Sequence, residues 1–129
     1  MALFRGRATT GVTDMNAISD LSWEGSLLLW RADGVERHVR LADDIVHALA
    51  LRSGGIAVVE GPRAVLLDED GRLKVSLANP FSPERGVIFY YFRYEGDELV
   101  LILAGPGGSD FKSIVDETSG ELSQPCEAR

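Results

Sequence analysis

The stretch VLLDEDGRLKVSL, residues 65–77, decides the fold class of this 129-residue chain. Three apolar residues run into an acidic cluster at 68–70, and Gly71 follows it. Glycine adopts a positive φ without a Cβ clash, so an Asp-Gly pair between apolar runs is a strong hairpin signal. Apolar and polar residues then alternate over 72–77, which places one face of a strand on a core. The sequence therefore predicts a β-hairpin here.

Similar segments fill most of the chain. Short runs rich in β-prone residues are separated by turn residues, and the most β-prone of them is VIFYYFRY at 87–94. We expect 8–10 antiparallel strands in meander order, roughly, which makes the chain an all-β domain. The clearest further strands are expected at 26–31, 35–41, 56–60, 98–104 and 111–115.

The segment 42–52 is ambiguous. As a helix it would carry acidic residues in its first turn and Arg52 in its last, and Gly54 would end it. As a strand it would alternate, with Ile45 and His47 on one side. The sequence repeat described next favours the strand.

Two parts of the chain repeat one another. The segment 66–73 corresponds to 114–122 with one inserted residue, and each follows a further hairpin that turns at 53–55 or at 95–97. Units of four short strands, spaced by about 40–50 residues, are typical of β-propeller blades. A weaker third copy lies at 27–35.

Residues 45–77 and 87–123 accordingly resemble two propeller-type blades of the quinoprotein-like kind, and the chain is similar to short bacterial proteins that carry one or two such units. The resemblance implies four short antiparallel strands in each unit. It implies no quinone cofactor, because Lys74 and Val75 stand where the tryptophan of that family follows the turn.

Two units are too few to close a propeller ring. We expect two four-stranded meander sheets that pack as a small sandwich-like single domain, covered by an N-terminal hairpin at 26–41, with flexible ends at 1–14 and 124–129. A ring assembled from several chains is the alternative.

Composition narrows the function classes. The net charge of −7 repels nucleic acids and anionic membranes and attracts basic partners. The single cysteine, Cys126, allows neither an internal disulfide nor a zinc cluster. No segment has the roughly 20 apolar residues of a membrane helix or the pattern of a signal peptide, so we expect a cytoplasmic location.

No pattern in the sequence indicates a catalytic, cofactor or metal site. His38 and His47 flank Asp43 and Asp44, but their spacing matches no metal signature. The acidic turns lack the later glutamate that completes a calcium loop. No serine occupies a Gly-x-Ser-x-Gly elbow.

The aromatic run at 89–94 is the strongest non-catalytic feature. Strand alternation places Tyr90, Phe92 and Tyr94 on one face and the other three residues on the opposite face. One set belongs to the core; the other either lines a partner surface or is covered within the fold. The candidate partner-binding residues are Asp68, Glu69, Asp70, Tyr90, Phe92, Tyr94, Asp116 and Glu117.

These observations favour a non-enzymatic protein-binding domain that is a monomer or a small homo-oligomer. A concrete version is an immunity or inhibitor protein that neutralises a basic bacterial toxin such as a nuclease, because an acidic surface speeds association with a basic partner. The alternative is an enzyme or small-ligand-binding β domain whose site is assembled from distant loops.

Overall fold

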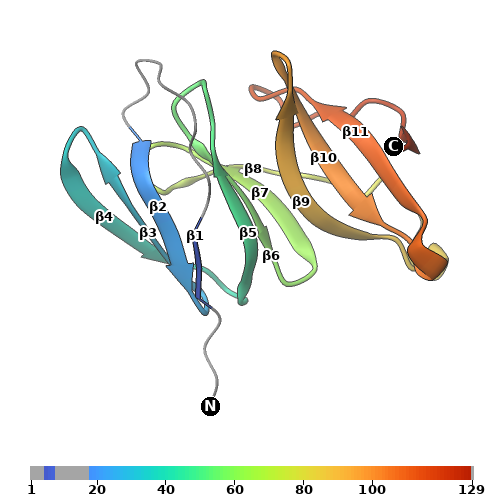
Figure 1. Cartoon of the computed structure of the whole chain (residues 1–129), viewed down its shortest axis with the longest axis horizontal. Coiled ribbons are helices and arrows are strands. Elements are labelled where there is room, and N and C mark those ends of the chain that lie inside the picture. The colour runs from blue at the N-terminus through green and yellow to red at the C-terminus, as the bar shows by residue number, and fades with distance from the viewer. Residues whose placement is uncertain (1–4, 8–17, 129) are drawn as a thin grey trace.

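A computed structural model of the protein describes residues 5–7 and 18–128, and this part is all-β. Its strands form three antiparallel sheets in which sequence neighbours pair (Figure 1). The N-terminal sheet contains β1 (Arg5–Arg7), β2 (Ile18–Glu24), β3 (Leu27–Ala32) and β4 (Val35–Arg40). The middle sheet contains β5 (Ile45–Ala50), β6 (Ile56–Glu60), β7 (Arg63–Leu67) and β8 (Leu73–Ser76). The C-terminal sheet contains β9 (Ile88–Glu95), β10 (Glu98–Ala104), β11 (Asp110–Val115) and β12 (Cys126–Glu127).

Two short 3₁₀ turns, Pro83–Arg85 and Pro106–Gly108, interrupt the connections. Across the described residues, no helix has the length and apolar character needed to cross a membrane.

The expected two sheets and a separate hairpin must be corrected to three sheets. The hairpin at 26–41 pairs with β2 and so belongs to a four-stranded sheet of its own. The sequence hid β2 because a bulge between Ser19 and Ser22 breaks its alternation, and Asp20 there takes a φ of +52°. The all-β class and the antiparallel meander order are confirmed.

The ambiguous segment 42–52 is a strand, β5. A bulge at Val46 shifts its register against β6. Beyond the bulge, Ala48 and Ala50 face the N-terminal sheet, whereas Leu49 and Leu51 face the C-terminal sheet. Apolar residues therefore appear on both faces, which gave the segment its helix-like composition.

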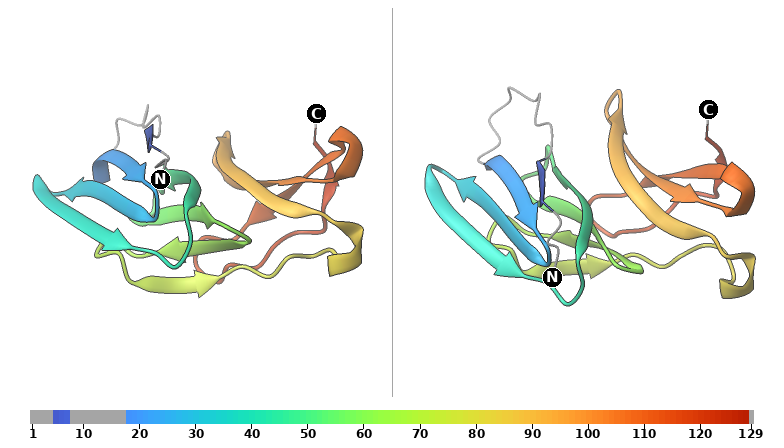
Figure 2. Two further views of the ribbon diagram at one scale, coloured as in Figure 1. Left: turned by 90° about the horizontal axis from the view of Figure 1, so that it is seen from below. Right: turned by 60° about the horizontal axis from the view of Figure 1, so that its bottom comes forward.

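The three sheets pack face to face as successive layers (Figures 1 and 2). Every residue of β6 is buried, because the middle sheet is covered on both sides. The first core, between the N-terminal and middle sheets, is built around Leu28 and Trp30. The second core, between the middle and C-terminal sheets, is built around Phe92 and Leu101. The expected two-sheet sandwich is therefore a three-layer stack.

The outer face of each terminal sheet carries charged side chains. On the N-terminal sheet, Arg31 pairs with Asp20 at 3.6 Å and with Glu36 at 3.4 Å. On the C-terminal sheet, the Glu95 carboxylate accepts hydrogen bonds from Arg93 and Lys112, at 2.9 Å each. These bonds hold the pKa of Glu95 below its ordinary value, and the bond from Lys112 has the larger effect. Ion pairs therefore lie on both outermost faces of the three sheets.

The chain ends bear on two further predictions. Within the expected C-terminal tail, Cys126 and Glu127 pair with β11 as β12. Of the expected flexible N-terminal segment, only Arg5–Arg7 lies within the described residues, and it pairs with β2.

Candidate protein-binding surface

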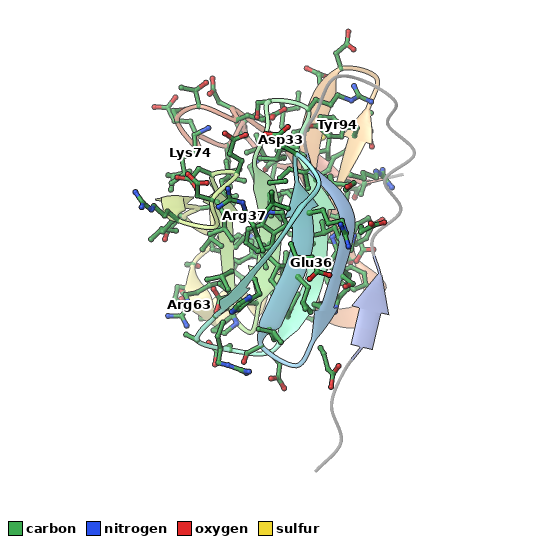
Figure 3. All side chains as sticks on the ribbon, turned by 90° about the vertical axis from the view of Figure 1, so that its left-hand side faces the viewer. Asp33, Glu36, Arg37, Arg63, Lys74 and Tyr94 are labelled. Carbon is green, nitrogen blue, oxygen red and sulfur yellow. The ribbon has the colours of Figure 1, made fainter. Side chains whose placement is uncertain are left out.

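Acidic turns from all three sheets lie at one end of the stack. In an up-and-down sheet the first and third turns share an end, and every sheet here has that order. The β9–β10 turn is at the top of Figure 1, and Figure 3 shows Asp33 and Tyr94 toward this end, away from Arg63. The Trp30 indole donates to the Glu69 carbonyl, and Tyr94 accepts the N–H of Arg52, so the turns of neighbouring sheets lie at the same end. We call the surface formed by their carboxylates the acidic end; it comprises Asp33, Asp68, Glu69, Asp70, Asp97, Asp116 and Glu117.

The Asp68 carboxylate shapes the turn between β7 and β8. Its Oδ1 accepts the backbone N–H groups of Asp70 and Arg72, at 2.9 and 3.0 Å. Gly71 follows with a φ of +84° and lies on the indole of Trp30, so that a Cβ at this position would come within 2.7 Å of the ring. Asp68 therefore serves the geometry of the turn, as short polar side chains commonly do.

The turn after β11 repeats this construction one sheet further along the chain. Asp116 Oδ1 accepts the N–H groups of Ser119 and Thr118, at 3.0 and 2.8 Å, and these bonds hold the pKa of the carboxyl below its ordinary value. Gly120, at φ +77°, lies on Val75 of the middle sheet. In both turns the glycine allows the chain to approach the preceding sheet closely.

The remaining carboxylates of the acidic end are available to a partner. Glu69 and Asp33 are exposed, and the Asp97 side chain is fully exposed although the Arg52 guanidinium lies 3.6 Å from it. Asp70 is half exposed and pairs with Arg37 at 3.1 Å. The surface therefore combines carboxylates that fix turns with carboxylates that face solvent.

Tyr94 connects the middle and C-terminal sheets just below the acidic end. Its hydroxyl donates to Glu117 at 2.9 Å and accepts the backbone N–H of Arg52 at 2.9 Å. The Arg52 guanidinium lies 4.1 Å from the centre of the Tyr94 ring, and Ser53 donates to the other oxygen of Glu117 at 2.6 Å. Burial, together with the neighbouring Glu117, raises the pKa of Tyr94 to about 12.

Sequence reasoning missed Arg52 and Ser53. Each is separated by 42 residues or more from its partners, which are Tyr94 and Gly96 for Arg52 and Glu117 for Ser53. No local pattern marks them, because the contact exists only when the turn after β5 reaches the C-terminal sheet.

The aromatic run does not alternate as expected, because Tyr90 is a bulge. Ile102 pairs with Tyr91 and the next residue, Leu103, pairs with Phe89, so Tyr90 has no partner in β10. Phe89, Phe92 and Tyr94 consequently share the core-facing side. Of the three aromatic candidates, Tyr90 is 47% exposed, Tyr94 is partly buried and Phe92 is 1% exposed in the core.

A shallow hollow of about 600 Å³ lies beside the acidic end on the C-terminal sheet. Asp116 and Glu117 line it together with Asp97, Glu98 and Glu121, next to the apolar side chains of Leu99 and Leu122. Its chemistry suits a cationic side chain with an apolar stem.

The two histidines do not form a joint site. His38 lies on the outer face of β4, whereas His47 lies between the rings of Trp23 and Tyr91. Among the residues that the structure describes, no group of three or more His, Cys, Asp or Glu side chains is arranged to hold a metal ion.

Comparison with known proteins gives no relative: no family model matches the chain, and neither does any curated protein.

Proposed function

We propose that this chain is a non-enzymatic protein-binding domain whose acidic end docks a basic partner. The concrete form of the proposal is an immunity or inhibitor protein that neutralises a basic bacterial toxin such as a nuclease. The observation that carries it is the collection of carboxylates from the β3–β4, β7–β8, β9–β10 and β11 turns at one end of the stack.

The opposite end of the stack has a mixed charge. There the Arg63 guanidinium lies 2.8 Å from Asp43 and 3.7 Å from the buried Glu60. Glu60 in turn accepts the backbone N–H of Asp43 at 3.0 Å. Arginines lie at both ends of the stack, since at the acidic end Arg37 pairs with Asp70 and the Arg52 guanidinium lies 3.6 Å from Asp97. The exposed carboxylates of Glu69 and Asp33 are therefore the groups that we expect to orient a basic partner during diffusional encounter.

Two double variants with the same net charge as each other test the proposal. Glu69→Gln with Asp97→Asn removes two exposed carboxylates of the acidic end, whereas Asp44→Asn with Glu84→Gln removes two elsewhere; both reduce the magnitude of the net charge of −7 equally. The wild-type chain, immobilised, is expected to retain a stoichiometric basic protein from a lysate of its host. The association rate of that protein should fall roughly tenfold for the first variant and little for the second.

Two results would contradict the proposal. One is the absence of any stoichiometric partner; the other is an equal loss of association rate in both variants, which would make the effect one of bulk charge. If the captured protein is a nuclease, its activity should be inhibited by addition of the free chain.

We also propose that the chain acts as a monomer. Its outer sheet faces carry ion pairs, with Arg31 on one and Glu95 on the other, which supports an open stack over a ring of several chains. Light scattering should give the mass of one chain; a higher defined mass would favour the ring that the blade-like repeat suggests.

A ligand-binding alternative rests on a second hollow, of about 400 Å³, on the outer face of the N-terminal sheet. His38 lines it beside Asp20, Arg31 and Glu36. Arg31 already pairs with both carboxylates, so the hollow suits a small polar ligand that exchanges with these ion pairs. Ligand-observed NMR screening, with His38→Gln as the control, would identify such a ligand.

A further inference from the structure

His47 on β5 lies where the three sheets meet. Its ring centroid lies 6.1 Å from that of Trp23 in the N-terminal sheet and 5.8 Å from that of Tyr91 in the C-terminal sheet. The ring planes are inclined by 73° and 72°, which is the edge-to-face geometry that aromatic rings prefer. The imidazole thus contacts both neighbouring layers.

A hydrogen bond adds a polar connection to this contact. Among the described strands, β9 pairs only with β10 and forms an edge of its sheet, so no described strand pairs with the backbone groups on its other side. His47 Nδ1 accepts the N–H of Phe92 at 3.4 Å and satisfies one of these edge donors. A ring that accepts at Nδ1 is neutral and carries its proton on Nε2.

The surroundings of His47 disfavour its charged form. Trp23 faces it from β2 and Val59 is its neighbour on β6, and neither is charged. From β9 it meets Tyr91, whose hydroxyl accepts from the Arg93 guanidinium at 3.3 Å. Within the described residues no carboxylate is hydrogen-bonded to the imidazole, and burial lowers its pKa.

We propose that His47 is a pH-sensitive latch: the neutral ring holds the free edge of β9 against the middle sheet, and protonation releases that edge. A proton on Nδ1 converts the acceptor into a donor that faces the Phe92 N–H, and two donors cannot bond to each other. The contact through Tyr94 and Arg52 remains closed, because the Tyr94 hydroxyl keeps its proton at every pH below about 12. Acid therefore loosens one side of the contact between the middle and C-terminal sheets.

The latch is a property of the free chain, so its test needs no partner and is independent of the proposed function. NMR spectra of the wild-type chain from about pH 7.5 to about pH 5 should show the Phe92 amide resonance shifting with the midpoint of the His47 ring titration. The protection factor of that amide, taken against the intrinsic exchange rate at each pH, should fall about fivefold over this range. The amide of Val58 in the middle sheet should keep its protection.

Two variants separate the latch from general acid effects. His47→Phe keeps a ring between Trp23 and Tyr91 but removes the acceptor, so the protection of the Phe92 amide should be low and independent of pH. His38→Gln removes the exposed histidine and should leave the wild-type response intact. If His47→Phe does not fold, the NMR titration of the wild-type chain alone tests the proposal.

Three results would overturn the inference. The first is a Phe92 amide whose shift ignores the titration of His47. The second is a His47 pKa at or above the ordinary 6.5. The third is an equal loss of protection at Val58, which would indicate global unfolding in place of a local release.

Discussion

The two contacts between sheets use the same turn but different chemistry. Between the N-terminal and middle sheets, Gly71 lies on Trp30, and the Trp30 indole donates to the Glu69 carbonyl at 3.2 Å. Between the middle and C-terminal sheets, Gly120 lies on Val75, and the Tyr94 hydroxyl supplies the polar connection by accepting the backbone N–H of Arg52. The repeated turn therefore fixes the spacing of the layers, while other side chains give each contact its strength and its response to pH.

The two contacts differ in the side chains that hold them. The first contact depends on a buried indole, with Trp30 2% exposed. The second contact adds two partly buried groups that titrate, His47, which accepts the Phe92 N–H, and Tyr94, which accepts the Arg52 N–H.

Truncation of one large aromatic side chain in each core should show whether the two sheet contacts open independently. Trp30→Ala and Phe92→Ala should each lower the free energy of unfolding by about 3–5 kcal/mol in urea titrations, because each leaves a cavity between layers. Hydrogen exchange should rise first in the N-terminal sheet for the former and in the C-terminal sheet for the latter. Leu29→Ala, at an exposed position on the same strand as Trp30, should cost less than about 1 kcal/mol. Identical exchange patterns in the two variants would mean that the contacts open together.

The close approach of Gly120 to Val75 can be tested by comparing two glycine-to-alanine variants. Gly120→Ala places a Cβ 2.8 Å from Val75, whereas Gly96→Ala, at a similar positive φ, meets nothing within 4 Å. The Gly96 change should cost about 1 kcal/mol of unfolding free energy from the backbone alone. The Gly120 change should cost about 1–3 kcal/mol more, because the sheets must move apart. Equal costs would show that the turn does not set the layer spacing.

Removal of one hydroxyl should weaken the second contact alone. Tyr94→Phe leaves Glu117 and the Arg52 N–H without this partner and should cost about 1–2 kcal/mol of unfolding free energy. Tyr90→Phe, on the same strand but half exposed, should stay within about 0.5 kcal/mol of the wild type. Ultraviolet titration of the wild-type chain should show one phenol ionising near pH 12. Ionisation of all the tyrosines over the same pH range would argue against the specific hydrogen bonds of the Tyr94 hydroxyl.

Acidification should lower stability in two stages. The folded-state pKa of His47 lies below its ordinary 6.5, so the unfolded chain binds the proton first and stability falls as pH drops below that value. The lowered pKa values of Glu95 and Asp116 make a second loss begin near their ordinary values of 4.5 and 3.8 and continue until the folded carboxyls are protonated. Urea denaturation across pH should show both stages, and His47→Phe should remove only the first. A single stage in the wild type would contradict the assignment to His47.

Much of the fold follows from local sequence. The Asp-Gly turn at 68–71 and the alternation after it predicted β7 and β8, and the repeat at 114–122 predicted an equivalent turn in the next unit. Bulges caused the errors. Single extra residues at Val46 and Tyr90 reverse the face of every side chain beyond them, and no propensity marks such a position.

The candidate surface was predicted in part. Acidic residues in turns were evident, but their common end depends on the up-and-down order of all three sheets. Phe92 was a candidate by composition, and its burial depends on the register of β9 against β10. Arg52 and Ser53 gave no signal, because their partners lie far along the chain.

The all-β class and the turns could be predicted because they depend on residues that are close together in the chain, and the charge follows from composition alone. The number of layers, the buried side of the aromatic run and the contact of His47 with all three sheets became clear only in the folded chain. These features depend on the pairing and stacking of distant strands. One bulge changes which face of a strand meets the core, so local pattern leaves such features undetermined.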